Sequence, residues 1–271
     1  MTADLHSHTH YSDGRESPAQ LVARARAAGI SILAVTDHGT VAGLAAAADA
    51  GREAGVEVVP GIEFSTFVIH AEVHLVGLWI DPHRPALIEA VRGYDVMRRK
   101  RAERMAEKVR ALGIPLQFEQ VAAIQRKGVF GRPHVAQALK EMGAVRTFQE
   151  AFQRFIGRDA PAYVRKEMLD AATVIAAIHA AGGVAVLAHG LVGGVDRPHV
   201  EALAPMGIDA VEVRHPKLTA AQSQWLREFA AQKGLAVSGG SDWHGEGWSE
   251  GKMGEWTVTE AEVRALQGRT K

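Results

Sequence analysis

Histidine and carboxylate residues recur along this sequence in short clusters. His6 and His8 are two residues apart, so on an extended strand both imidazoles project to the same face and could hold one metal ion. Further candidate ligands follow at intervals: Asp13, Asp37, His38, Glu63, His74, His189, Glu212, His215, Asp242 and His244. There is no cysteine, which excludes thiolate metal sites, cysteine nucleophiles and disulfides. Any bound metal must therefore be held by imidazole and carboxylate groups, which suit ions such as Mn²⁺, Fe²⁺ and Zn²⁺.

Each cluster lies within or directly after a short apolar run that is typical of a buried strand. Seven such runs alternate with alanine-rich helical stretches: the run ending at Leu5, then residues 32–35, 57–62, 72–80, 184–188, 210–213 and 236–239. This alternation predicts an α/β fold in which parallel strands close into an irregular (β/α)7 barrel. The carboxyl ends of barrel strands meet at one end of the barrel, so we expect the clusters to converge there.

The pattern changes in the middle of the chain, where long helical stretches replace the alternation. Residues 84–166 hold 18 Lys and Arg against 8 Asp and Glu, a net of +10, which leaves −10 for the rest of the chain. We therefore expect a metal-binding barrel formed by residues 1–83 and 167–271, with residues 84–166 as an inserted basic helical subdomain. The basic insertion could attract an anionic substrate, although a charged solvated surface would explain it equally well.

Six segments in this order resemble the PHP (polymerase and histidinol phosphatase) family of metal-dependent phosphoesterases. They are DLHSHTHYSDG at 4–14, AVTDHGT at 34–40, PGIEFS at 60–65, HLVG at 74–77, AHG at 188–190 and GGSDWHG at 239–245. Three others resemble a subgroup that hydrolyses nucleoside 3′,5′-bisphosphates or trims short RNA from its 5′ end: GRPHVA at 131–136, AYVRK at 162–166 and EVRHP at 212–216. The resemblance implies a PHP-type barrel with an inserted helical subdomain.

Carried over residue by residue, the resemblance implies three divalent metal ions, Mn²⁺ with Fe²⁺ or Zn²⁺ as alternatives. The implied ligand sets are His6, His8, Glu63 and Asp242 for one ion, Glu63, His74 and His189 for a second, and Asp13, His38 and His244 for a third. Glu63 would bridge two ions. All nine positions carry competent ligands, which argues against an inactive copy of the site.

Five further residues are candidates for roles around these ligands. Arg132 and His134 lie in the basic segment, and the subgroup resemblance assigns them to a substrate phosphate, because a guanidinium can pair with two phosphate oxygens. Alternatively, Arg132 and the following proline only begin a helix. Lys166 is a weaker phosphate candidate. His215 could protonate the leaving oxygen or orient a ligand, and Asp37 could likewise orient a ligand.

The resemblance implies hydrolysis of a phosphate monoester by a metal-bound hydroxide, converting a nucleoside 3′,5′-bisphosphate to a nucleoside 5′-monophosphate and phosphate. Three alternatives stay open: a 5′-3′ exoribonuclease acting on short RNA, a histidinol-phosphate phosphatase and a non-catalytic metal-binding scaffold. We expect a small phosphorylated partner or a short RNA, and neither a membrane nor a stable protein partner. The absence of a signal-peptide pattern and of a long apolar run favours a cytoplasmic location.

Overall fold

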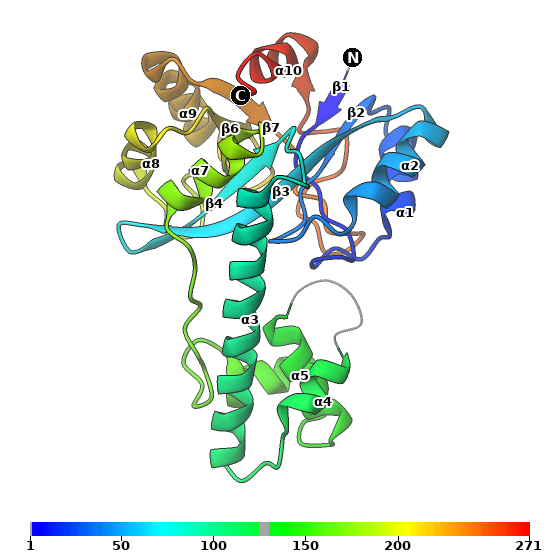
Figure 1. The fold of residues 1–271 in the computed structure, drawn as a ribbon, viewed down its shortest axis with the longest axis vertical. Helices are drawn as coiled ribbons and strands as arrows, with labels where there is room; N and C mark the ends of the chain where they lie inside the picture. The colour runs from blue at the N-terminus through cyan, green and yellow to red at the C-terminus, as the bar shows by residue number, and fades with distance from the viewer. Residues whose placement is uncertain (1, 125–129) are drawn as a thin grey trace. The chain divides into compact units, whose positions relative to one another are not determined.

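The computed structural model describes residues 2–124 and 130–271, which form two compact units (Figure 1). Unit 1 comprises Met1–Val91 and Leu169–Lys271, and unit 2 comprises Arg92–Met168. Helix α3 (Pro85–Ala111) begins in unit 1 and continues into unit 2. Within the described ranges, no helix is both long enough and apolar enough to cross a membrane.

Unit 1 is built on one sheet that curves into a barrel (Figure 1). Its strands are β1 (Thr2–Asp4), β2 (Ile32–Val35), β3 (Glu57–Val68), β4 (Ala71–Leu78), β5 (Val184–Ala188), β6 (Ala210–Arg214), β7 (Ala236–Gly239) and β8 (Val258–Thr259). Their order in the sheet is β7-β6-β5-β4-β3-β2-β1-β8. Backbone hydrogen bonds close the barrel between the segments that follow β1 and β7: Leu5 N to Gly239 O (3.1 Å), Asp242 N to His6 O (3.0 Å) and His8 N to Trp243 O (2.9 Å). The predicted α/β barrel is confirmed.

The seven predicted strands are all present, but they are not all parallel. Strand β4 pairs antiparallel with both β3 and β5. Only Ile69 and His70 separate β3 from β4, and both have positive φ (46° and 71°), so these strands form a tight hairpin and must run in opposite directions. The short strand β8, which the sequence pattern did not predict, pairs antiparallel with β1.

Six helices pack around the strands of unit 1: α1 (Pro18–Ala27), α2 (Leu44–Ala54), α7 (Ala171–Ala180), α8 (Arg197–Leu203), α9 (Ala220–Lys233) and α10 (Glu260–Gln267). The start of α1 follows from its sequence. Ser17 Oγ accepts a hydrogen bond from Gln20 N, and the Gln20 side chain accepts one from Ser17 N, so two otherwise unpaired donors are satisfied. Small and branched residues such as Ala34, Val76 and Val186 form one buried core cluster of this unit.

Unit 2 is helical in its described part, as the sequence predicts. After α3 come α4 (Phe118–Ile124), α5 (Arg132–Glu141), α6 (Phe148–Ala151) and a π-helical turn (Phe152–Ile156). Its own apolar core includes Met105, Val109, Leu116, Val135 and Leu139. The chain that leaves this core is held to α3, because Lys108 Nζ donates to Tyr163 O at 2.8 Å.

Candidate metal centre

The nine predicted ligands all belong to unit 1, and the barrel brings them to one end. The segment after β1 carries His6 and His8, which are fully buried. His38 follows β2, His189 follows β5 directly, and Asp242 and His244 follow β7. His74 lies in the middle of β4, opposite the last residue of β5, Ala188. Because β4 runs antiparallel, it is the middle of this strand that reaches the same end of the barrel.

Glu63, on β3, lies at the centre of this group and is 1% exposed. Its Oε1 faces two imidazoles, His74 Nδ1 at 2.7 Å and His189 Nε2 at 3.2 Å. Its Oε2 faces three, with distances of 3.2 Å to His6 Nε2, 3.2 Å to His8 Nε2 and 3.1 Å to His38 Nδ1. One carboxylate therefore connects two separate groups of imidazoles through its two oxygens, which is the arrangement that a bridging ligand requires.

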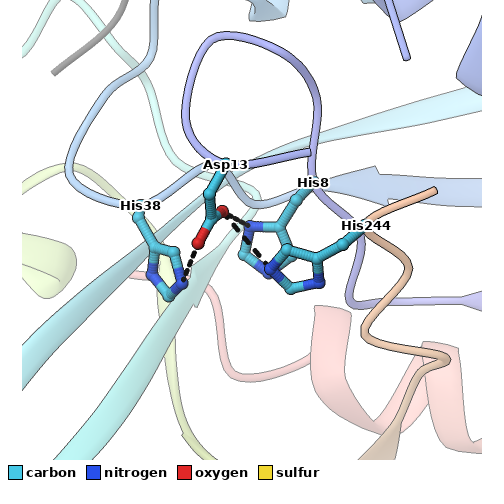
Figure 2. A group of neighbouring side chains, drawn as sticks. All are labelled: His8, Asp13, His38 and His244. Carbon is cyan, nitrogen blue, oxygen red and sulfur yellow. Dashed lines mark ion pairs between the residues drawn. The ribbon is translucent and has the colours of Figure 1, made fainter. Parts of the chain in front are cut away.

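A second group surrounds Asp13, and Figure 2 shows its members converging. Asp13 Oδ1 lies 3.3 Å from His244 Nε2 and 3.9 Å from His8 Nδ1, while Asp13 Oδ2 lies 3.6 Å from His38 Nε2. The His8 and His244 rings stack with centroids 4.1 Å apart. The implied ligand set named Asp13, His38 and His244, and the structure adds His8 to their neighbourhood.

The donor atoms fit divalent cations. Both ring nitrogens of His8, together with His38 Nδ1, are buried and have no hydrogen-bond partner among the described residues, although carboxylate oxygens lie 3.1–3.9 Å away. Ligand atoms about 3 Å apart can share one ion that lies roughly 2.1 Å from each of them. Unpaired buried nitrogens next to carboxylates are costly in a closed protein interior but are suitable for coordination.

The buried carboxylates and imidazoles around Glu63 shift one another's pKa values. Burial alone would lower the pKa of His8, but the carboxylates of Asp242 and Glu63 outweigh it and raise the pKa to about 10. Burial would raise the pKa of Glu63, but His38, His6 and other imidazoles hold it well below its usual range. For His38, burial dominates and lowers the pKa to about 3. The buried carboxylates are thus balanced by protons on neighbouring imidazoles, and a cation could take over this role.

Two of the predicted ligands have backbone conformations that non-glycine residues rarely adopt. His189 has φ 31° and Asp242 has φ 50°, both in the left-handed region. Such conformations persist only when the surroundings hold them, and they concentrate at functional sites. Asp242 N donates to His6 O at 3.0 Å, and His189 N donates to Glu212 Oε2 at 2.6 Å.

Glu212 belongs to the site; it stands among the candidate ligands in the sequence, but neither the spacing nor the resemblance assigned it a role. It is 3% exposed on β6, and its Oε1 lies 3.0 Å from His6 Nδ1 while its Oε2 holds the His189 backbone. One carboxylate thus orients two predicted ligands. In the sequence, its role could have been suspected because it is a carboxylate within an otherwise apolar predicted strand.

His215 and Asp37 also lie at this end of the barrel. His215 Nε2 lies 3.3 Å from Asp242 Oδ2, and His215 Nδ1 accepts a hydrogen bond from Lys217 N at 3.1 Å. Asp37 accepts hydrogen bonds from Thr9 N (2.8 Å), Thr9 Oγ1 (2.6 Å) and Ser12 Oγ (2.6 Å). Its carboxylate therefore secures the loop that leads to Asp13.

The segment after β7 can approach the segment after β1 closely because position 240 is a glycine. A Cβ atom at Gly240 would lie 2.5 Å from both the backbone N and the Cβ of His6. No real Cβ tolerates such a contact, so any other residue at position 240 would displace the segment that carries His6.

The predicted phosphate-binding residues all belong to unit 2. Helix α5 begins at Arg132, whose guanidinium lies over the Phe152 ring, 5.2 Å from its centroid. His134 Nδ1 accepts from Gly131 N at 3.1 Å, and burial lowers the pKa of His134. Lys166 is half-buried in the segment that follows the π-helical turn. Their substrate contacts stay a prediction.

Comparisons with known proteins agree with this geometry. The sequence matches the PHP domain family over residues 4–115. It is 36% identical over 252 residues to a 5′-3′ exoribonuclease from Haemophilus influenzae, covering 91% of this chain and 92% of that protein. It is 32% identical over 249 residues to a 3′,5′-nucleoside bisphosphate phosphatase from Chromobacterium violaceum, covering 90% and 87%.

A solved structure extends the likeness to the whole fold. It is a putative metal-dependent phosphoesterase from Bifidobacterium adolescentis with a TM-score of 0.85 and 31% sequence identity, and the match covers 99% of this chain and 96% of that one. The PHP-type barrel that the sequence motifs imply is confirmed. Together with the convergent His, Asp and Glu side chains, these similarities show that the chain is a metal-dependent phosphoesterase of the PHP family.

Proposed function

We propose that this protein removes the 3′-phosphate of a nucleoside 3′,5′-bisphosphate, releasing a nucleoside 5′-monophosphate and phosphate. The observation that carries the proposal is the position of Glu63, which faces His74 and His189 through Oε1 and His6, His8 and His38 through Oε2. Several cations held this close together would suit a phosphate ester, whose oxygens are negatively charged. Likeness to a bisphosphate phosphatase supports the choice of substrate.

We assign the ligands to three ions. His6, His8, Glu63 and Asp242 would hold one, Glu63, His74 and His189 a second, and Asp13, His38 and His244 a third. Mn²⁺ is the proposed occupant, with Fe²⁺ or Zn²⁺ as alternatives, because the donor set is mixed imidazole and carboxylate. Bound there, divalent cations lower the pKa of water and offset charge on the attacking and leaving oxygens.

The protein's own residues position this chemistry. His215 Nδ1 accepts the backbone N–H of Lys217, so the ring proton is on Nε2, which faces Asp242 Oδ2. This tautomer favours an orienting role for His215 over proton donation to the leaving group. Asp37 orients the loop before Asp13 through Thr9 and Ser12. Neither residue then needs to exchange a proton with the substrate.

Arg132, His134 and Lys166 are proposed to bind a substrate phosphate. A guanidinium can form two parallel hydrogen bonds to phosphate oxygens, whereas an ammonium acts as a point charge. Arg132→Lys should therefore raise the KM for a bisphosphate while keeping the charge. An unchanged KM would remove Arg132 from the substrate site.

Phosphate release from a panel of substrates tests the proposed function. The panel contains adenosine 3′,5′-bisphosphate, AMP, histidinol phosphate and a 5′-phosphorylated short RNA, each with Mn²⁺ and after chelation. We expect metal-dependent release that is fastest with the bisphosphate. Turnover of histidinol phosphate alone would refute the proposed substrate while leaving the metal centre in place.

A second candidate is 5′-3′ exoribonuclease activity on short RNA, which the likeness to the Haemophilus influenzae protein favours. The 5′-phosphorylated RNA separates the two candidates. Stepwise release of mononucleotides from its 5′ end, at a rate above that of bisphosphate hydrolysis, would make RNA the principal substrate.

A further inference from the structure

A small pocket adjoins the candidate metal centre beside Asp242 and His244. Lys217, Trp248 and Glu250 contribute to its wall. Its empty volume is about 250 Å³, a figure that includes open solvent at the mouth. The pocket is therefore small and open to solvent.

Trp248 presents an indole on the wall of this pocket and is 63% exposed. The Arg15 guanidinium lies 3.8 Å from the centroid of the indole, and Ser249 Oγ accepts a hydrogen bond from His244 N at 2.7 Å, so both the ring and its turn are held. A large, exposed and oriented aromatic ring offers a flat surface on which a base can stack.

Charged groups of both signs line the pocket. Lys217 Nζ lies 3.4 Å from Asp242 Oδ2, and Glu250 adds a carboxylate to the wall. The lining also includes the buried hydroxyl of Ser241, which has no hydrogen-bond partner within the described residues. A buried polar atom without a partner costs free energy, so this hydroxyl suits an occupant that offers a hydrogen bond. The chemistry indicated for the occupant is a flat ring that also carries hydrogen-bonding groups.

We propose that this pocket binds the nucleoside part of the substrate, with its base stacked on Trp248. The inference rests on the proposed function, because it assumes a nucleotide whose phosphate reacts at the adjoining centre. Trp248 would then determine specificity for substrates that carry an aromatic base over other phosphate monoesters.

The test compares two substrates that differ only in the base: adenosine 3′,5′-bisphosphate and the base-free 1,4-anhydroribitol 3,5-bisphosphate. Their ratio of kcat/KM is measured for the wild type, Trp248→Ala and Trp248→Phe, all loaded with Mn²⁺. Trp225→Phe on α9 controls for loss of an indole elsewhere. We expect Trp248→Ala to lower the ratio by roughly 5- to 100-fold through KM, as expected for loss of one base-aromatic stack, and Trp248→Phe to restore part of it.

Binding without turnover gives an independent readout. Adenosine has no phosphate ester to hydrolyse, and we expect it to quench tryptophan fluorescence in the wild type and in Trp225→Phe but not in Trp248→Phe. An equal loss of activity on both substrates in Trp248→Ala, or quenching that persists in Trp248→Phe, overturns the subsite. If the wild type quenches through Trp248 yet does not hydrolyse the bisphosphate, the subsite stands and the proposed substrate fails.

Discussion

Glu212→Gln tests how the barrel orients its metal ligands. The Glu212 carboxylate faces His6 Nδ1 at 3.0 Å through one oxygen and accepts from His189 N at 2.6 Å through the other. Glutamine keeps the shape but has one acceptor oxygen, so one of the two donors would face an NH₂ group. Loss of such a partner typically weakens metal binding roughly 10- to 100-fold. That is about 1.4 to 2.8 kcal/mol of binding free energy.

The assay is a calorimetric titration of metal-depleted protein with Mn²⁺, performed below the melting temperature of every variant. Glu53→Gln, an exposed residue on α2, is the matched control because it makes the same chemical change away from the centre. We expect weaker Mn²⁺ binding for Glu212→Gln and wild-type affinity for the control. Wild-type affinity in a folded Glu212→Gln protein would refute the orienting role.

Three further predictions follow from the same structure. Burial alone would raise the pKa of Glu262, but the hydrogen bonds that it accepts from Arg214 and Thr259 outweigh burial and lower the pKa below 4.5. The stabilisation that ionised Glu262 provides is therefore complete above pH 4.5 and is lost as the pH falls through the lowered pKa. Acid unfolding followed by circular dichroism should show a weaker pH dependence in Glu262→Gln. Asp37→Ala leaves the buried Thr9 donors without an acceptor, and urea denaturation should show a loss of about 1–3 kcal/mol of unfolding free energy. Chelation of divalent cations should lower the melting temperature, since ions that bind only the native state at 100 times their Kd add about 2.7 kcal/mol of stability; an unchanged melting temperature in a protein shown to have lost its metal would contradict this.

Much of the barrel could be predicted because local sequence determines it. The runs at 32–35, 184–188 and 236–239 match β2, β5 and β7 to the residue. Each is a short apolar stretch with glycine or polar residues close to its ends, so its bounds are visible in the pattern. Convergence of the nine candidate ligands could also be anticipated, because strand ends in a barrel meet regardless of their distance in sequence.

Other features depend on contacts that no local pattern reveals. The reversed direction of β4 comes from a two-residue turn in which Ile69 and His70, rather than glycine, adopt positive φ. The orienting role of Glu212 is recognisable only from its contacts with His6 and His189, which are 206 and 23 residues away in sequence. Trp248 becomes a candidate for base stacking only once the structure shows Arg15 against its ring and the pocket beside Asp242.

We propose that the His, Asp and Glu side chains around Glu63 and Asp13 hold the metal ions. A crystal grown with Mn²⁺ and measured at the manganese absorption edge tests it most directly, because anomalous peaks locate the ions without assumptions about ligands. We expect peaks within about 2.0–2.3 Å of these side chains, with one peak on each side of the Glu63 carboxylate. Manganese bound elsewhere in an active protein, with no peak among these residues, would contradict it.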